Sequence, residues 1–341
     1  MAGQREAMFW KEKEDDTVEC ELCPHNCTIK NGRRGICGIR ENVNGILVPR
    51  AYGIYPAVHS DPIEKKPLYH FLPGESILSV GSVGCNLNCR YCQNWSLSKD
   101  NIDGKDGFYI SPEEMVRGAK REGSVGIAFT YNEPTINAEY ILDAGPLLRR
   151  EDMKMVLVTN GFLSPEPWDR IMEYTDGANI DVKGFTERFY RDLTGSRLEP
   201  ILRNVKSAFE RSVHVELTYL VIPGYNDSPE EVDEYLNWVK ENISDDIPLH
   251  FTRFHPDYKM SDVPATPVDT LERIMKQCER AGMKYFYIGN VLLNDYNNTG
   301  CPECGKVVIK RSGFSIKTKG LKHGKCSSCG APIRGGVDSG R

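Results

Sequence analysis

Eleven of the twelve cysteines in this 341-residue chain fall into three tight groups. In chain order the groups are Cys20, Cys23, Cys27 and Cys37, then Cys85, Cys89 and Cys92, and then Cys301, Cys304, Cys326 and Cys329. Thiols gathered at such short spacings are typical of metal binding. We therefore predict an N-terminal four-cysteine metal-binding module over residues 1–50, a central body over 51–299 and a C-terminal metal-binding module over 300–341.

The central body alternates strand-like runs, rich in β-branched and aromatic residues, with helical runs. The strand-like runs are 77–82, 126–131, 155–160, 178–182, 213–221 and 249–254, with 284–290 as a further candidate. Two helical runs open with Ser-Pro-Glu-Glu, in which Ser111 and Ser228 are expected to cap the helix. This alternation predicts an α/β fold with a parallel sheet, either a partial or full (β/α) TIM-type barrel or a doubly wound sheet. Polar motifs directly after the strands favour the barrel, whose active sites lie at those strand ends.

Charge and hydropathy narrow the classes of function. The chain has 43 Lys and Arg against 48 Asp and Glu, a net charge of -5, which disfavours a non-specific nucleic-acid binder. No stretch of about 18 apolar residues is present, so no membrane span is predicted. The charged start lacks the apolar segment of a signal peptide. We expect a cytoplasmic protein, in which disulfides are a poor explanation for so many thiols.

The second cysteine group lies in GSVGCNLNCRYCQNW, directly after the predicted strand 77–82. Three thiolates at the spacing C-x3-C-x2-C suit three corners of a [4Fe–4S] cluster, for which four cysteines are usual. The iron without a thiolate would be open to the amino and carboxylate groups of S-adenosylmethionine (SAM). The alternative is a zinc site with a distant fourth ligand such as Cys278. The spacing, with Tyr91 before the last cysteine, resembles the radical SAM superfamily, which implies reductive cleavage of SAM to a 5′-deoxyadenosyl radical.

This resemblance implies that cofactor-binding side chains follow successive strands. The residues it implicates are Tyr91, Asn132, Glu133, Thr159, Asn160, Asp181, Lys183 and His255. Glu133 lies in TYNEPT, where the superfamily has a Gly-Gly-Glu-like motif for the methionyl amino group, but Tyr131 and Asn132 replace the two glycines. Asp181 and Lys183 are two apart on a predicted strand and therefore point to the same face. Taken singly, each of these residues is equally well read as a surface or salt-bridged group.

Longer segments of the sequence resemble particular branches of this superfamily. Segments 180–195 and 221–227, together with Thr-Asn-Gly at 159–161, look like the glycyl-radical activase branch, whose members abstract hydrogen from a glycine of a partner protein. The flanking cysteine groups, RFHPDYKM and YIGNV resemble the AmmeMemoRadiSam-system radical enzymes. The resemblance implies a protein or peptide substrate and an electron donor such as ferredoxin or flavodoxin. The same chemistry on a small molecule or a nucleic acid, and a non-enzymatic zinc scaffold, are the alternatives. We also predict that Tyr131, Tyr219, Arg253 and Tyr258 line the substrate cavity.

The two flanking groups differ in how clearly they indicate a metal. The C-terminal group has two C-x2-C-G knuckles separated by 21 residues, which is typical of a zinc ribbon. The N-terminal group, C-x2-C-x3-C-x9-C, favours a structural zinc, with a second iron–sulfur cluster as the alternative. Such a cluster would imply an electron-entry route or a substrate site. His25 lies between two of these cysteines and is a candidate replacement ligand.

Overall fold

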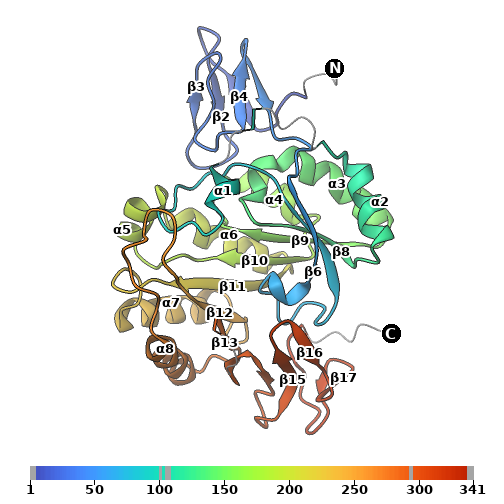
Figure 1. Ribbon diagram of the computed structural model, residues 1–341, viewed down its shortest axis with the longest axis vertical. Helices are drawn as coiled ribbons and strands as arrows, with labels where there is room; N and C mark the ends of the chain where they lie inside the picture. Colours follow the sequence, from blue (N-terminus) through green and yellow to red (C-terminus); the bar gives the residue numbers. More distant parts are fainter. Residues whose placement is uncertain (1–4, 100–101, 104–108, 292–294, 336–341) are drawn as a thin grey trace.

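The computed structural model describes residues 5–99, 102–103, 109–291 and 295–335. Its centre is an eight-stranded sheet in the order β13-β12-β11-β10-β9-β8-β7-β6 (Figure 1). The strands are β6 (Ala57–Pro62), β7 (Ser76–Gly81), β8 (Gly126–Phe129), β9 (Lys154–Thr159), β10 (Gly177–Asp181), β11 (His214–Val221), β12 (Leu249–Arg253) and β13 (Phe286–Gly289). β6 pairs antiparallel with β7, and every other pair in this sheet is parallel. The predicted α/β fold with a mostly parallel sheet is confirmed.

Helices connect the parallel strands. They are α1 (Trp95–Ser98), α2 (Pro112–Arg121), α3 (Ala138–Arg150), α4 (Pro165–Met172), α5 (Glu187–Phe189), α6 (Glu199–Glu210), α7 (Pro229–Asn242) and α8 (Val268–Ala281). The two predicted serine caps are present: the backbone N–H of Glu114 donates to Ser111, and that of Glu231 donates to Ser228. Pro112 and Pro229 occupy the first helical positions, where a missing N–H costs nothing.

The edge strand β6 is the one strand of the large sheet that the sequence did not predict. Its residues are mostly exposed, so the run lacks the apolar character that identifies the buried strands. Among the described residues, β6 and β13 are the two ends of the strand order, and no pairing joins them. Hydrogen bonding in the described chain therefore leaves the sheet open between β13 and β6.

Two small β-rich modules lie at opposite ends of the molecule (Figure 1). The N-terminal module contains β1 (Trp10–Glu12), β2 (Val18–Cys20), β3 (Thr28–Ile29), β4 (Arg40–Val43) and β5 (Ile46–Pro49). The C-terminal ribbon contains β14 (Thr299–Gly300), β15 (Val307–Ser312), β16 (Ser315–Lys317), β17 (Leu321–Lys322) and β18 (Lys325–Cys326). None of the helices in the described part of the chain is long and apolar enough to cross a membrane.

The two modules are packed differently against the sheet. Buried side chains of the N-terminal module, including Val18, Leu22 and Leu47, belong to the same apolar cluster as the strands and helices of the main body. The ribbon instead has a small cluster of its own, which includes Val308 and Ile309 and reaches the sheet through Tyr285, Tyr287 and their neighbours. The N-terminal module is thus continuous with the main core.

Candidate functional site

The loop that carries the central cysteines follows β7 and is held by its neighbours on both sides. The side chain of Asn132, after β8, accepts from Ser82 N at 3.0 Å and donates to Gly84 O at 2.9 Å. Gly84 has φ +85°, and a Cβ there would lie 2.5 Å from the backbone oxygen of Cys37. Only glycine fits this position, because both the backbone angle and the close contact exclude a side chain. The N-terminal module therefore packs directly against the backbone of Gly84, the residue before Cys85.

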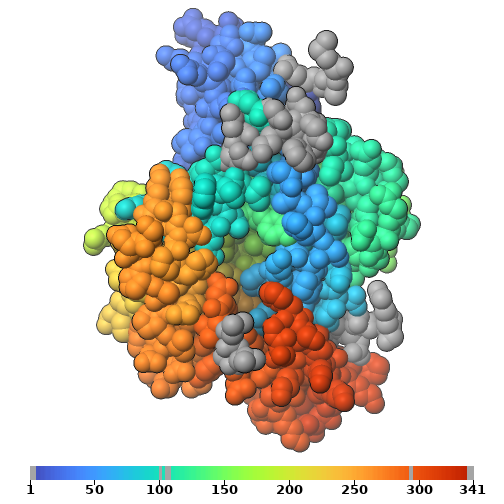
Figure 2. Space-filling view, in the orientation of Figure 1, coloured from blue at the N-terminus to red at the C-terminus, as the bar shows by residue number. Residues whose placement is uncertain are grey.

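A cavity of about 420 Å³ lies at the carboxyl ends of the parallel strands. Cys85, Cys89 and Cys92 all line it. Seven of the eight predicted cofactor residues line it as well, namely Tyr91, Asn132, Glu133, Thr159, Asn160, Asp181 and Lys183. Figure 2 shows a hollow on this face, bordered by the orange segment after β12 and the blue segment around η1 (Ile63–Lys65). The structure thus brings together side chains that the sequence places on four successive strand ends.

Glu133 is the centre of a hydrogen-bond network that joins β8 to β9. Its Oε1 accepts from the hydroxyls of Thr135 and Thr159, each at 2.7 Å, and its Oε2 accepts from Asn160 N at 2.7 Å. Burial raises the pKa of this carboxyl, and the donated hydrogen bonds oppose that rise. Through these hydrogen bonds Glu133 positions the Thr-Asn-Gly turn. This structural role would remain if Glu133 also contacts a cofactor.

Asp181 and Lys183 lie at the end of β10 and share an ion pair, with Nζ 2.9 Å from Oδ2. Burial opposes the charged amine, yet Asp181 and then Cys89 raise the pKa of Lys183 above its usual value. The reverse effect is present on the thiol: burial raises the pKa of Cys89, and the Lys183 charge lowers it. Lys183 therefore stays charged next to a cysteine of the loop and favours that cysteine as a thiolate.

Tyr91 is buried, with its ring centroid 5.9 Å from that of Phe189. Burial raises the pKa of its hydroxyl, and the neighbouring Cys89 raises it further, so this hydroxyl lies beside a cysteine of the loop at the cavity wall. His255 differs: its side chain is 56% exposed, it is not among the residues that line the cavity, and its Nδ1 is 3.1 Å from Gln93 Nε2.

Of the four residues predicted to line the substrate cavity, only Tyr131 does so in the described lining. Tyr219 is buried, and its hydroxyl donates to Asn226 O and Glu231. Arg253 donates to Thr266 O, and Tyr258 stacks on the exposed Trp95 with the rings 5.7 Å apart. These three side chains are not among the residues that line this cavity, because sequence position alone does not show which way a side chain at a strand end turns.

Several lining or supporting residues were not predicted from the sequence, and Asn86, Lys65 and Lys66 are three of them. Asn86 donates to Phe162 O at 2.7 Å and accepts from Asn160 Nδ2 at 2.9 Å, so it joins the cysteine loop to the Thr-Asn-Gly turn. Its position directly after Cys85, inside the motif, was the available signal. Lys65 and Lys66 line the cavity from the segment after β6, a strand that was not predicted. No motif marks them.

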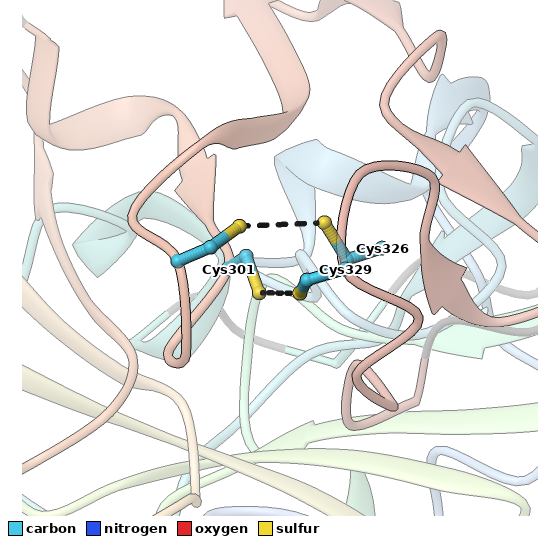
Figure 3. Close-up of side chains that lie close together, drawn as sticks. Cys301, Cys326 and Cys329 are labelled. Atoms are coloured by element: carbon cyan, nitrogen blue, oxygen red, sulfur yellow. Dashed lines mark hydrogen bonds between the residues drawn. The ribbon is translucent and has the colours of Figure 1, made fainter.

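The C-terminal cysteines form a compact group, the one set of three or more metal-binding side chains found within 4.8 Å of one another in the described residues. Cys301 Sγ lies 3.6 Å from Cys329 Sγ, and Cys304 Sγ lies 3.7 Å from Cys326 Sγ (Figure 3). Ser328 N donates to Cys326 Sγ at 3.4 Å, as expected for a knuckle that stabilises a thiolate. Four thiols in this arrangement are suited to hold one metal ion.

Three of the N-terminal cysteines, Cys20, Cys23 and Cys27, lie at the end of β2 and in the β2–β3 connection, and Cys37 lies between β3 and β4. Cys20 N donates to Cys27 O at 2.9 Å, and Gly35 leaves space against the Cys27 sulfur, where a Cβ would be 3.6 Å away. Burial raises the pKa of Cys23, and its neighbours Cys37, Cys20 and Cys27 raise it further. The four thiols are therefore near enough to influence one another.

Comparison with known proteins agrees with this geometry. A protein of Methanocaldococcus jannaschii whose function is uncharacterised is 41% identical over 331 residues, which is 96% of this chain and 98% of that protein. The pyruvate formate-lyase 1-activating enzyme of Escherichia coli is 24% identical over 222 residues, or 60% of this chain and 89% of that enzyme. The solved structure of Streptococcus suis SuiB bound to S-adenosylmethionine has a similar fold, with a TM-score of 0.50 and 16% identity, covering 63% of this chain and 52% of that one.

Residues 79–239 match the family described as the radical SAM superfamily. The matched range begins in β7, contains the three central cysteines and ends within α7, so it includes most of the residues that line the cavity. The family implies a [4Fe–4S] cluster and S-adenosylmethionine as cofactors, in agreement with the three thiols in the cavity wall. This chain belongs to the radical SAM superfamily of enzymes.

Proposed function

We propose that this enzyme cleaves S-adenosylmethionine reductively and abstracts hydrogen from a residue of a protein or peptide, with the sheet curved as a partial (β/α) barrel. One observation carries the proposal: three cysteines and seven predicted cofactor-binding side chains face a single cavity of about 420 Å³. Carboxyl ends of parallel strands are where such folds place their active sites. A metal-binding scaffold without enzymatic activity would not need the three cysteines and the seven predicted cofactor-binding side chains to gather at the same strand ends.

The donor set in the cavity fits the two cofactors. Cys85, Cys89 and Cys92 are three thiol ligands, and Cys278 is buried in α8 and does not line the described cavity. A cluster held in this way keeps one iron free of protein ligands. When bound, the cluster and SAM supply one-electron cleavage of a carbon–sulfur bond, and the protein supplies position and shielding.

The protein's own charges provide matched partners for SAM. Lys183 offers a cation to the methionyl carboxylate, and Asp181 offers an acceptor to ribose hydroxyls, since both line the cavity and lie 2.9 Å apart. Glu133 and the turn that it orders are positioned for the methionyl amino group. Tyr91 closes the wall with a buried ring, which would exclude water from the adenine side. These assignments rest on the lining and on the family resemblance together.

A protein or peptide substrate is supported by the similarity to a pyruvate formate-lyase activating enzyme, a protein that by its name acts on another enzyme. The resemblance to the AmmeMemoRadiSam-system enzymes assigns the chain to a subgroup of the superfamily but does not indicate a particular substrate. We propose that a ferredoxin or flavodoxin supplies the electron. We further propose that the C-terminal ribbon holds a structural zinc ion, because its sulfur spacings match those of a tetrahedral four-thiolate site.

The central test is SAM cleavage by the anaerobically reconstituted and reduced protein. We expect 5′-deoxyadenosine and methionine as products. Cys89→Ala should abolish them, and Cys278→Ala, which removes a thiol outside the three groups, should leave the rate within about twofold. Absence of cleavage in wild-type protein, with the cluster confirmed by its absorbance and iron content, would refute the proposed activity.

The substrate class requires a separate test. Candidate substrates deuterated at the target carbon should transfer deuterium into 5′-deoxyadenosine, as detected by mass spectrometry. Glycine-containing peptides that transfer label would support the activase-like function. Transfer from a small molecule or nucleic acid, with none from any peptide or protein tested, would favour the second function with the same radical chemistry.

A further inference from the structure

We propose that the N-terminal group of Cys20, Cys23, Cys27 and Cys37 binds a polynuclear iron–sulfur cluster in place of the zinc ion that its spacing first favoured. A ligand set of four cysteines is the usual one for such a cluster, and it differs from the three-cysteine set in the cavity. The site would therefore be a second cluster with no iron left open for substrate.

Sulfur spacing separates the two flanking groups. A tetrahedral zinc with Zn–S bonds of about 2.3 Å requires sulfurs about 3.8 Å apart. The ribbon meets this requirement, with two of its sulfur pairs at 3.6 and 3.7 Å. In the N-terminal group, all of which lies in the described chain, no three sulfurs fall within 4.8 Å of one another. The three cysteines of the cavity, also in the described chain, likewise do not all lie within 4.8 Å of one another.

A wider set of thiols suits a cluster because several irons and sulfides fill the space between the ligands, whereas one ion draws its four sulfurs together. The N-terminal group therefore has the same number of thiols as the ribbon but, like the cavity cysteines, lacks the ribbon's compact arrangement in the described chain. His25 is not needed as a replacement ligand, since its Nε2 is 2.8 Å from Asn86 O.

Burial raises the pKa of Cys23, Cys27 and Cys37, and backbone N–H groups oppose that rise: that of His25 acts on Cys23, that of Ile36 on Cys27, and those of Ile39 and Arg40 on Cys37. The Arg40 side chain is 1% exposed and close enough to Cys20 and Cys37 for their charges to act on it. Hydrogen bonds to sulfur and nearby cations are the second-shell features that stabilise a cluster and tune its potential.

The position of the module gives the second cluster a use. Cys37 O lies against Gly84 and His25 contacts Asn86 O, so the module touches the residues on both sides of Cys85. A one-electron donor protein would be oxidised as the N-terminal cluster is reduced, and the same electron would then pass to the cavity cluster. No bond is formed or broken and no proton moves in this transfer. The module would therefore be the electron entry of the enzyme.

Metal analysis of anaerobically isolated full-length variants tests this site without any turnover. A variant with Cys85, Cys89 and Cys92 all changed to Ala should retain about two to four irons per chain and about one zinc. On reduction it should give a paramagnetic resonance signal that SAM does not alter. Adding Cys23→Ala and Cys27→Ala should remove this iron and signal but leave the zinc. The control Cys278→Ala should match wild type in both metals.

The opposite result is equally clear. A triple variant that carries no iron and about two zincs per chain would overturn the proposal. Because a variant can fail to fold, wild-type protein supplies a second measurement: more than about four irons with about one zinc supports the second cluster. About four irons with about two zincs in wild type would refute it, whatever the variants do.

Discussion

The N-terminal module and the C-terminal ribbon each carry four cysteines, yet they are joined to the enzyme in different ways. The N-terminal module shares the main apolar core and reaches the residue before Cys85. The ribbon has its own small core and lies at the far end of the molecule (Figure 1). The comparison shows that two modules with equal cysteine counts can be joined to the main body differently, because one is continuous with the main core beside the candidate site and the other has a core of its own.

The anchors of the two modules also differ. A buried ion pair between Arg40 and Glu139, with Nη1 2.9 Å from Oε1, fixes the N-terminal module to α3. The ribbon is held by a polar network near the amino ends of β11 and β13. There Arg311 donates to Thr299 and to Tyr69 O, and the buried His70 contacts Tyr287. The N-terminal segment has a second ion pair to α3, between Arg5 and Asp143, and shares the main apolar core, whereas the ribbon's polar anchor is made of hydrogen bonds.

The largest expected effect is loss of the ribbon's structure on removal of the zinc ion that we propose it holds. Binding of structural zinc contributes on the order of 10 kcal/mol in small zinc modules, and so small an apolar core offers little replacement. Cys301→Ser with Cys326→Ser should abolish amide protection over 299–312. Protection of β7–β12, measured in the same hydrogen-exchange experiment, should remain. Loss of protection throughout the sheet would mean that the ribbon belongs to the main cooperative unit.

The next effect concerns the anchor of the N-terminal module. Glu139→Gln leaves the Arg40 guanidinium buried without its partner, which typically costs about 3–5 kcal/mol. We expect this loss in urea unfolding of the holoprotein. The matched control is Glu151→Gln, which breaks the exposed pair with Lys120 and should cost less than about 1 kcal/mol. Equal losses in the two variants would show that the buried pair does not anchor the module.

The ribbon anchor should respond to pH through His70. Burial lowers the pKa of His70 to about 4; Glu216 opposes this shift, whereas Arg311 and His214 add to it. The unfolded chain binds the proton near pH 6.5 and the folded chain does not, so stability is complete above pH 6.5 and falls as the pH drops toward 4. The contribution lost over that window is about 3 kcal/mol.

His70→Gln removes the titrating group and keeps a polar side chain. The difference in free energy of unfolding between wild type and variant, measured by urea at pH 7.5, 6 and 5, should therefore shrink as the pH falls. A difference that stays constant across these values would contradict the shifted pKa. This difference in free energy of unfolding also distinguishes the titration of His70 from release of the proposed zinc ion in acid, because such release would affect both proteins equally.

The sequence predicted the alternating strands and helices of the fold and the site residues that directly follow those strands. Each parallel strand was predicted within a few residues, because buried runs bounded by capped helices are strong local signals. The cavity residues followed from their places after those strands. Three features could not be predicted because they depend on long-range contacts. They are β6, which has no apolar pattern, Lys66, which lines the cavity from the segment after β6, and Asn86, whose side-chain partners lie more than 70 residues away.

Cys278 gives the smallest expected effect and a baseline for both modules. It is fully buried in α8, where burial raises the pKa of its thiol, so it is a neutral and apolar side chain. Cys278→Ala removes one buried atom and should cost about 1 kcal/mol in urea unfolding, with iron and zinc contents unchanged. Cys278→Ser should cost more, because a buried hydroxyl needs a partner that a thiol does not. A change in the iron or zinc content of either variant would contradict the assignment of Cys278 to a place outside the three metal-binding groups.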